Sequence, residues 1–228
     1  RPTSFAKKGI KSFVGYHNGN FVATLSVGKS VSGSFNYQGT SYEISDSKGQ
    51  LVFYKSEQGI CGNQDKEPHK HSAFARPVLA AEEAQPKIAN TQVLRVYRLA
   101  MHIPYSTFTT EHFKEKLQKV ETFWADTENF LNEIYLRDLG VRFEVLKDER
   151  LIIKDEAKET FRRTDRADYV MSNSTRVIGE LIDENSYDVG ISLVYTSSLK
   201  KGTRGLAYIE GVYQPNTKAD AVAVLTKE

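Results

Sequence analysis

Two local patterns divide this chain, and they constrain the fold more than any single motif does. Residues 1–54 contain five short runs in which apolar and polar residues alternate, as in half-exposed β-strands, and none has helical spacing. The pairs Asn18-Gly19, Gln38-Gly39 and Lys48-Gly49 lie between runs, and such pairs favour tight hairpin turns. We therefore predict a small antiparallel β-meander. It is too short to bury a large core alone, so we expect it to pack on a partner.

From residue 91 to residue 228, strands and helices are predicted to alternate. A long helix is expected to begin after an N-cap at Thr109 or Thr110 and to end at Gly140. A shorter helix carries residues 177–182. This alternation predicts an α/β sheet with crossover helices. The strand-like runs are residues 93–100, 141–146, 189–195, 206–209 and 221–225, and the apolar residues at helical spacing are Phe113, Leu117, Val120, Trp124, Leu131 and Ile134.

Residues 55–90 separate the two regions and have no periodic pattern. They contain Pro68, Pro77 and Pro86 among polar residues and alanines, a composition typical of an extended linker. Segments of this length without secondary structure are often functional or cleavable.

Composition excludes several classes of protein. Of the 228 residues, 39% are hydrophobic and 26% are charged, with a net charge of +2, which is typical of globular proteins rather than disordered chains. No apolar run approaches the ~18 residues of a membrane span, and no basic excess indicates nucleic-acid binding. The single cysteine excludes a disulfide framework and a multi-cysteine zinc site. The chain begins with Arg1 rather than methionine, which leaves an exported, processed origin open.

No complete catalytic motif is present in the sequence. No histidine has a second histidine four residues on, and phosphate-binding, dinucleotide-binding and serine-hydrolase motifs are missing. We expect His69 and His71 to be solvated in the linker rather than to bind a metal. His102 and His112 flank the start of the long helix and are expected to pack or cap. From these residues alone, the chain is an α/β domain with a β-rich appendage.

The order of segments in the second half is more informative than any one of them. It resembles the N-terminal half of the catalytic domain of bacterial reprolysin-like (adamalysin-type) zinc metallopeptidases of the metzincin clan, over residues 91–226. The resemblance implies an α/β metzincin-like catalytic subdomain, a mixed sheet with crossover helices, preceded by a small antiparallel β pro-region. It rests on residues 94–100, the helix end and strand at 132–143, residues 187–190 and residues 205–209.

In that family, the helix with the zinc motif HExxHxxGxxH follows the strand that residues 221–225 resemble. The sequence given stops at Glu228, before such a helix. The resemblance therefore implies zinc as cofactor, with its ligands beyond Glu228, and no catalytic residue in this chain. Residues 1–54 would be a propeptide, 55–90 a linker, and 91–228 the upper half of the catalytic domain. The chain is either the upstream piece of a longer or cleaved protease, or a descendant that lost the active half.

The resemblance gives Cys61 a role, because such propeptides often hold the enzyme inactive through one cysteine. The run Gly59-Ile60-Cys61-Gly62-Asn63 resembles a cysteine switch. A thiolate binds zinc at about 2.3 Å and would displace the water that zinc activates, while the two glycines permit close approach. The alternative is that Cys61 is a small buried apolar residue, although its flanking residues are polar.

The segment Gly205-Leu206-Ala207-Tyr208 would be the edge strand above the active-site cleft. In the resembled fold, this strand binds an extended peptide substrate by main-chain pairing, and Gly205 would give a flat approach. The alternative is an ordinary core or edge strand, and the sequence does not separate the two.

These expectations combine into one functional hypothesis and two alternatives. The chain is interpreted as the zymogen portion of a secreted or cell-surface bacterial zinc endopeptidase, with a maturation cut between Gly62 and Asn90. Its partners would be a polypeptide substrate and its own cleaved C-terminal catalytic half, with no nucleic acid and no membrane span. The alternatives are a non-catalytic α/β binding or interaction module on the same scaffold, and an unrelated α/β domain that shares the pattern.

Overall fold

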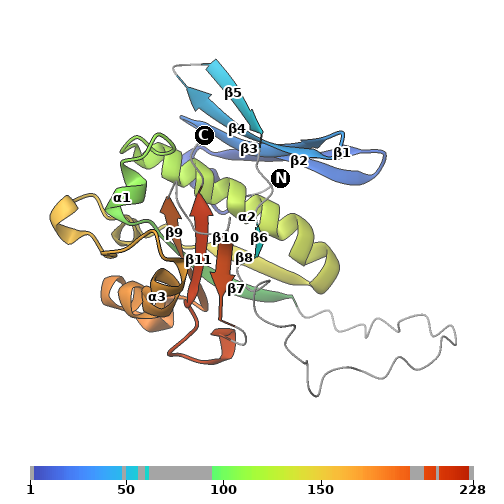
Figure 1. The fold of residues 1–228 in the computed structure, drawn as a ribbon. Helices are drawn as coiled ribbons and strands as arrows, with labels where there is room; N and C mark the ends of the chain where they lie inside the picture. The colour runs from blue at the N-terminus through green and yellow to red at the C-terminus, as the bar shows by residue number, and fades with distance from the viewer. Residues whose placement is uncertain are drawn as a thin grey trace, which may run out of the picture.

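Helix α2 (Leu117–Leu139) lies between two β-sheets in the computed structural model (Figure 1). The structure describes residues 3–47, 50–55, 60–61, 94–195, 203–208 and 211–225. Sheet A is antiparallel and has five strands, and sheet B is mixed and has six. Strands β1, β2 and β3 of sheet A and strand β8 of sheet B all contact α2.

Sheet A is the predicted meander, with its five strands paired in sequence order. At the first turn Asn18 and Gly19 have φ values of 49° and 79°, and at the next Gln38 and Gly39 have 49° and 76°. Two successive positive φ values are typical of the type I′ turn that suits a twisted hairpin. The strands are β1 (Lys11–His17), β2 (Asn20–Val27), β3 (Val31–Tyr37), β4 (Thr40–Ser47) and β5 (Gln50–Lys55).

Sheet B has the strand order β6-β10-β11-β9-β7-β8. The pairs β7–β8, β7–β9 and β9–β11 are parallel, whereas β10 is antiparallel to β11. The expected mixed α/β sheet is therefore present, and this architecture is compatible with a metzincin-like domain. The strands are β6 (Ile60–Cys61), β7 (Arg95–His102), β8 (Val141–Val145), β9 (Val189–Tyr195), β10 (Thr203–Ala207) and β11 (Ala221–Leu225).

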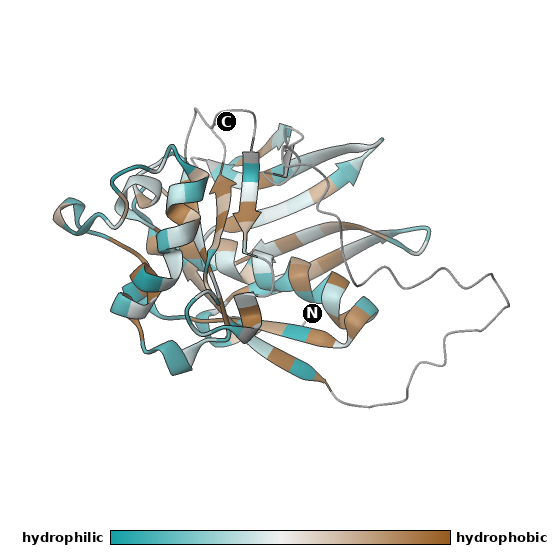
Figure 2. Cartoon of the chain, turned by 60° about the horizontal axis from the view of Figure 1, so that its bottom comes forward, coloured by the Kyte–Doolittle hydropathy of each residue, from teal (hydrophilic) through white to brown (hydrophobic). Residues whose placement is uncertain are grey.

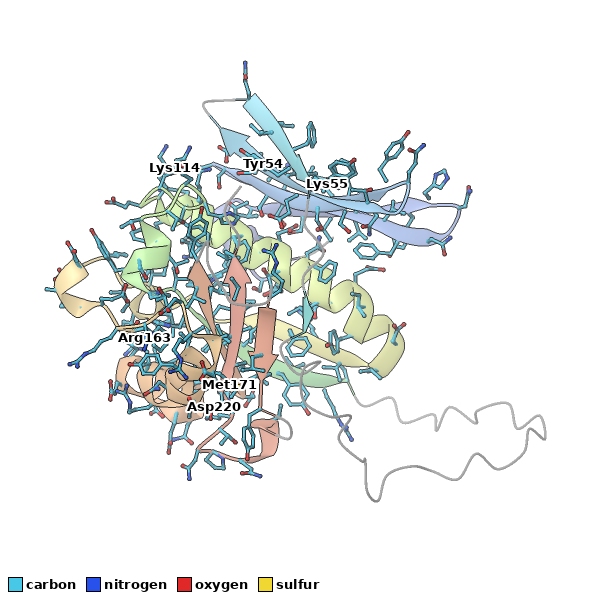
Figure 3. All side chains as sticks on the ribbon, in the orientation of Figure 1. Tyr54, Lys55, Lys114, Arg163, Met171 and Asp220 are labelled. Carbon is cyan, nitrogen blue, oxygen red and sulfur yellow. The ribbon has the colours of Figure 1, made fainter. Side chains whose placement is uncertain are left out.

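The start of the long helix differs from the prediction. A separate helix, α1, covers Tyr105–Phe108, and α2 begins only at Leu117, so the N-cap expected at Thr109 or Thr110 is wrong. Lys114 and Glu115 have φ values of 51° and 56°, and two left-handed residues cannot continue a right-handed helix. Lys114 lies in the loop that precedes α2 (Figure 3). The predicted end is confirmed, because Gly140 is the left-handed C-cap with φ 64°.

Helix α3 (Ala167–Leu181) covers the face of sheet B opposite to α2. Successive strand side chains point to opposite faces of a sheet. Val194 and Val222 pack with Val170 and Val177 of α3. Leu193 and Ala223 pack in the larger core, which contains Val120 and Trp124 of α2 and also Ile178 of α3. Short 3₁₀ turns cover Ala6–Lys8, Glu149–Leu151, Glu156–Lys158, Glu184–Ser186 and Gly211–Tyr213.

Sheet A buries its polar face and exposes its apolar one. Apolar and polar residues alternate along its strands (Figure 2). Ser12, Thr24 and Ser26 are buried. The Thr24 hydroxyl donates to Asp126 of α2 at 3.3 Å, and the hydroxyls of Ser12 and Ser26 lie 2.9 Å apart. Phe13 and Phe53, on the outer face, are 50% and 57% exposed.

Candidate functional site

Strand β10 has a neighbour on each side, and the two neighbours come from distant parts of the chain. On the inner side Gly205 pairs with Ala223 of β11 in antiparallel register. On the outer side β10 pairs in parallel with β6, so that Thr203 lies opposite Ile60 and Gly205 opposite Cys61 (Figure 1). The structure thus brings together the backbones of the two segments that the sequence suggested as functional.

The side chains of β10 differ in exposure. Leu206 is half-buried against the cluster on α3, whereas Tyr208, just after the strand, is 54% exposed. The backbone N–H of Tyr208 donates to the carbonyl of Asp220, 2.8 Å away, and this bond continues the pairing beyond Ala207. A Cβ at Gly205 would meet, among the described atoms, only the Val222 oxygen at 3.4 Å, an ordinary contact. The packing of β11 therefore does not itself require glycine at this position.

Several other predicted features lie outside the described residues. The thiol of Cys61 is one of them, because only the backbone of β6 is described. The flanking Gly59 and Gly62, the histidines His69 and His71, and the stretch in which the maturation cut was expected are also outside.

The two histidines near the start of the long helix pack as predicted. His102 is fully buried, and its ring lies edge-on to Phe161 with 5.5 Å between centroids. His112 lies edge-on to Phe113 and Phe123, at 4.9 and 5.7 Å. Across the described ranges, no three His, Cys, Asp or Glu side chains are grouped so that they could hold a metal ion.

A buried chain of hydroxyls around His102 was not foreseen from the sequence. Nδ1 of His102 lies 3.2 Å from the Ser192 hydroxyl, and Nε2 lies 3.3 Å from the Thr160 hydroxyl. Ser192 also hydrogen-bonds Ser174 of α3. A serine beside a histidine can be a nucleophile and its base, but here both side chains are completely buried, so substrate has no access. The chain of bonds fastens α3 to the sheet, and its members are too far apart in sequence to form a motif.

Burial of the two histidines predicts a loss of stability in acid. Desolvation lowers the pKa of His102 to about 3, and desolvation together with Lys119 lowers the pKa of His112 to about 4. An unfolded histidine takes up a proton near pH 6.5. The contribution of the two neutral histidines to the free energy of unfolding is therefore fully present above pH 6.5. Below this pH the free energy of unfolding falls by about 1.4 kcal/mol per pH unit for each histidine. Urea unfolding at pH 7.5, 6.5, 5.5 and 5.0 measures this slope.

Asp126 changes the free energy of unfolding with pH in the direction opposite to the two histidines, so the measured slope contains its contribution as well. It lines a cavity of about 190 Å³ between sheet A and α2, together with Glu43, Tyr54, His112 and Lys119. Burial raises its pKa to about 6, so its contribution is lost as the pH rises through this value.

A variant pair isolates the histidine contribution. His102→Gln should lower the acid slope by the contribution of one histidine, because His112 remains, whereas His17→Gln, at an exposed position, should leave the slope unchanged. An unaltered slope in His102→Gln would show that His102 does not stay neutral in the fold.

Comparison with known proteins bears on the half of the chain that contains α2, α3 and strands β8 to β11. Residues 124–227, a little under half of the chain, match the model of the family described as Metallo-peptidase family M12B Reprolysin-like. This part of the chain is similar to the reprolysin-like metallopeptidases. No curated protein matches the chain.

The reprolysin-like segment includes β10 but not sheet A or β6. The reprolysin-like resemblance drawn from the sequence is thereby confirmed over residues 124–226, and the match does not extend to residues 91–123. Metallopeptidases of this family are generally zinc-dependent and act on polypeptides. None of the helices in the described part of the chain is both long enough and apolar enough to cross a membrane.

Proposed function

We propose that this chain is the zymogen portion of a secreted or cell-surface bacterial zinc endopeptidase, in which β10 aligns the substrate and Cys61 maintains latency. The observation that carries the proposal is the pairing of β6 with β10. An extended peptide can bind a protein by adding a strand to an exposed sheet edge. Ile60 and Cys61 lie on that edge, opposite Thr203 and Gly205, where a substrate strand would have to pair.

The backbone of β10 would supply the alignment. Main-chain hydrogen bonds fix the register of a bound peptide whatever its sequence. Side chains beside the strand favour particular residues of that peptide. Ala207 and Tyr208 are exposed there, so among the described residues they would lie beside a bound substrate.

Latency would come from Cys61. No described residues fit a zinc site, and we propose that the ligands lie beyond Glu228. Zinc bound there would polarise the scissile carbonyl and lower the pKa of its bound water. The pairing of β6 places the backbone of Cys61 on the edge strand, and a thiolate from that position would take the place of the water.

The test uses the full-length protein with Cys61→Ala and Cys61→Ser. Without the thiolate ligand, we expect peptidase activity on an unfolded protein substrate to rise about tenfold or more above the wild type, with the zinc content unchanged. Leu51→Ala, at an exposed position outside the proposed site, is the control and should stay latent. Residues 1–228 alone should show no activity and no stoichiometric zinc.

Two results would contradict the proposal in different ways. If Cys61→Ala stays as latent as the wild type while zinc is bound, the role of Cys61 is wrong and the family assignment stands. If the reading frame beyond Glu228 encodes no histidine motif and the protein binds no zinc, the chain is a non-catalytic binding module on the same scaffold.

A further inference from the structure

The first residues of the chain are part of the core of the second half. Phe5 is fully buried and Ile10 is 4% exposed, and both belong to the cluster that contains Trp124 of α2 and Leu99 of β7. The Lys147 ammonium lies 5.0 Å from the centroid of the Phe5 ring, on the side of β8. The N-terminal segment therefore fills a place in the main core rather than lying on its surface.

One buried carboxylate joins this segment to both α2 and sheet B. Glu128 of α2 is only 3% exposed. Its oxygens accept hydrogen bonds from the N–H of Ser4 at 2.9 Å, the hydroxyl of Ser4 at 2.6 Å and the hydroxyl of Thr3 at 3.3 Å. They also accept one from the N–H of Val145 at 3.0 Å. Without Thr3 and Ser4, Glu128 would lose most of its donors, and a buried carboxylate without partners is costly.

Sheet A is attached to α2 by hydrogen bonds along the helix. The Ser30 hydroxyl lies 2.6 Å from that of Thr122 and donates to the carbonyl of Gln118 at 3.0 Å. The amide of Asn129 donates to the carbonyl of Phe13 at 2.9 Å. These bonds satisfy polar groups on both elements that would otherwise be buried without partners.

An ion pair and a further hydrogen bond also join residues 3–55 to α2. Lys8 pairs with Glu121, and the Tyr16 hydroxyl donates to Glu133. Contacts between residues 3–55 and α2 thus extend from Gln118 to Glu133.

We propose that residues 3–55 stay bound to residues 94–225 after the chain between them is cut, as a non-covalent subunit rather than a released leader. Departure would expose Phe5 and Ile10 and leave Glu128 short of donors. Among the described residues, two residues of β6 pair with β10, and this short pairing can open while sheet A stays in place. Relief of latency would then need the loss of β6 alone. The proposal rests on the proposed function only for the physiological meaning of the cut.

The test needs neither zinc nor activity. A recognition sequence for a site-specific endoprotease is inserted between Ala81 and Glu82 of the full-length protein, and the cut product is studied by native mass spectrometry and size-exclusion chromatography. We expect both fragments in one complex at micromolar concentration. Separation of the wild-type fragments under native conditions would overturn the proposal, whatever the variants do.

A matched pair of phenylalanine variants tests whether the buried side chain of Phe5 holds residues 3–55 on residues 94–225. Phe5→Ala should weaken the complex of the cut protein by roughly 100-fold, because it removes a fully buried aromatic side chain. Phe53→Ala makes the same change at a position that is 57% exposed and should leave the complex intact. Equal retention in the two variants would show that Phe5 is not the anchor. Because these readouts ignore catalysis, their failure is distinguishable from failure of the proposed peptidase function.

Discussion

Replacing Trp124 by alanine is expected to lower the free energy of unfolding by about 4 kcal/mol. Trp124 is 1% exposed and lies on α2 in the core that includes Phe5, Val120 and Leu193. Removal of the indole loses its burial and leaves a cavity that the surrounding elements can fill only in part. Urea unfolding followed by circular dichroism measures the loss, and an unchanged m-value would show that both proteins unfold to the same extent.

Trp124→Phe is the matched control for this prediction. It keeps an aromatic ring in the core and removes the indole N–H, which has no hydrogen-bond partner among the described residues. The loss should therefore be much smaller, about 1 kcal/mol. Equal losses in the two variants would mean that the N–H, rather than the volume of the ring, is what the core requires.

Replacing Gly190 by alanine is expected to cost about 3 kcal/mol, because the site has no room for a methyl group. Gly190 is the second residue of β9 and lies on the face of sheet B that α3 covers. A Cβ at this position would overlap the Cβ of Ala219 and lie 3.1 Å from Cδ1 of Ile178. Ala219 and Ile178 are themselves fully buried, so neither can move aside without disturbing the core.

The same substitution at Gly179 should raise the free energy of unfolding instead of lowering it. Gly179 lies within α3, and no described atom lies within 4 Å of the Cβ that alanine would add. Alanine restricts the unfolded chain and favours a helix over glycine by about 0.5–1 kcal/mol. Thermal unfolding of the two variants should therefore shift the midpoint in opposite directions. A destabilised Gly179→Ala would contradict the open space around this residue.

Local signals in the sequence were sufficient for most of the elements. The hairpin turns at Asn18-Gly19 and Gln38-Gly39, and the helix end at Gly140, depend on backbone preferences of the residues that form them. Strands β9 and β11 have the predicted bounds, 189–195 and 221–225. Their apolar runs are buried or half-buried on both faces, and such runs are visible without knowledge of the partner strands.

The start of α2 and the orientation of sheet A were decided by tertiary structure. The helical spacing of apolar residues includes Phe113, yet Phe113 precedes the left-handed pair at Lys114 and Glu115 and is buried from the loop. An alternating strand has an apolar face and a polar face, and burial of the apolar face is the ordinary outcome. Sheet A does the reverse, because the hydroxyls of Ser12, Thr24 and Ser26 face the polar side of α2.

The candidate site shows the same division between local and long-range information. The sequence alone determined that Ile60-Cys61 lies between glycines and that residues 205–208 can form a strand, since both properties belong to neighbouring residues. Only the tertiary structure placed Gly205 opposite Cys61. Pairing between segments so distant in the chain depends on which edge of sheet B remains open after β11, β9, β7 and β8 have paired, and no local pattern contains that information.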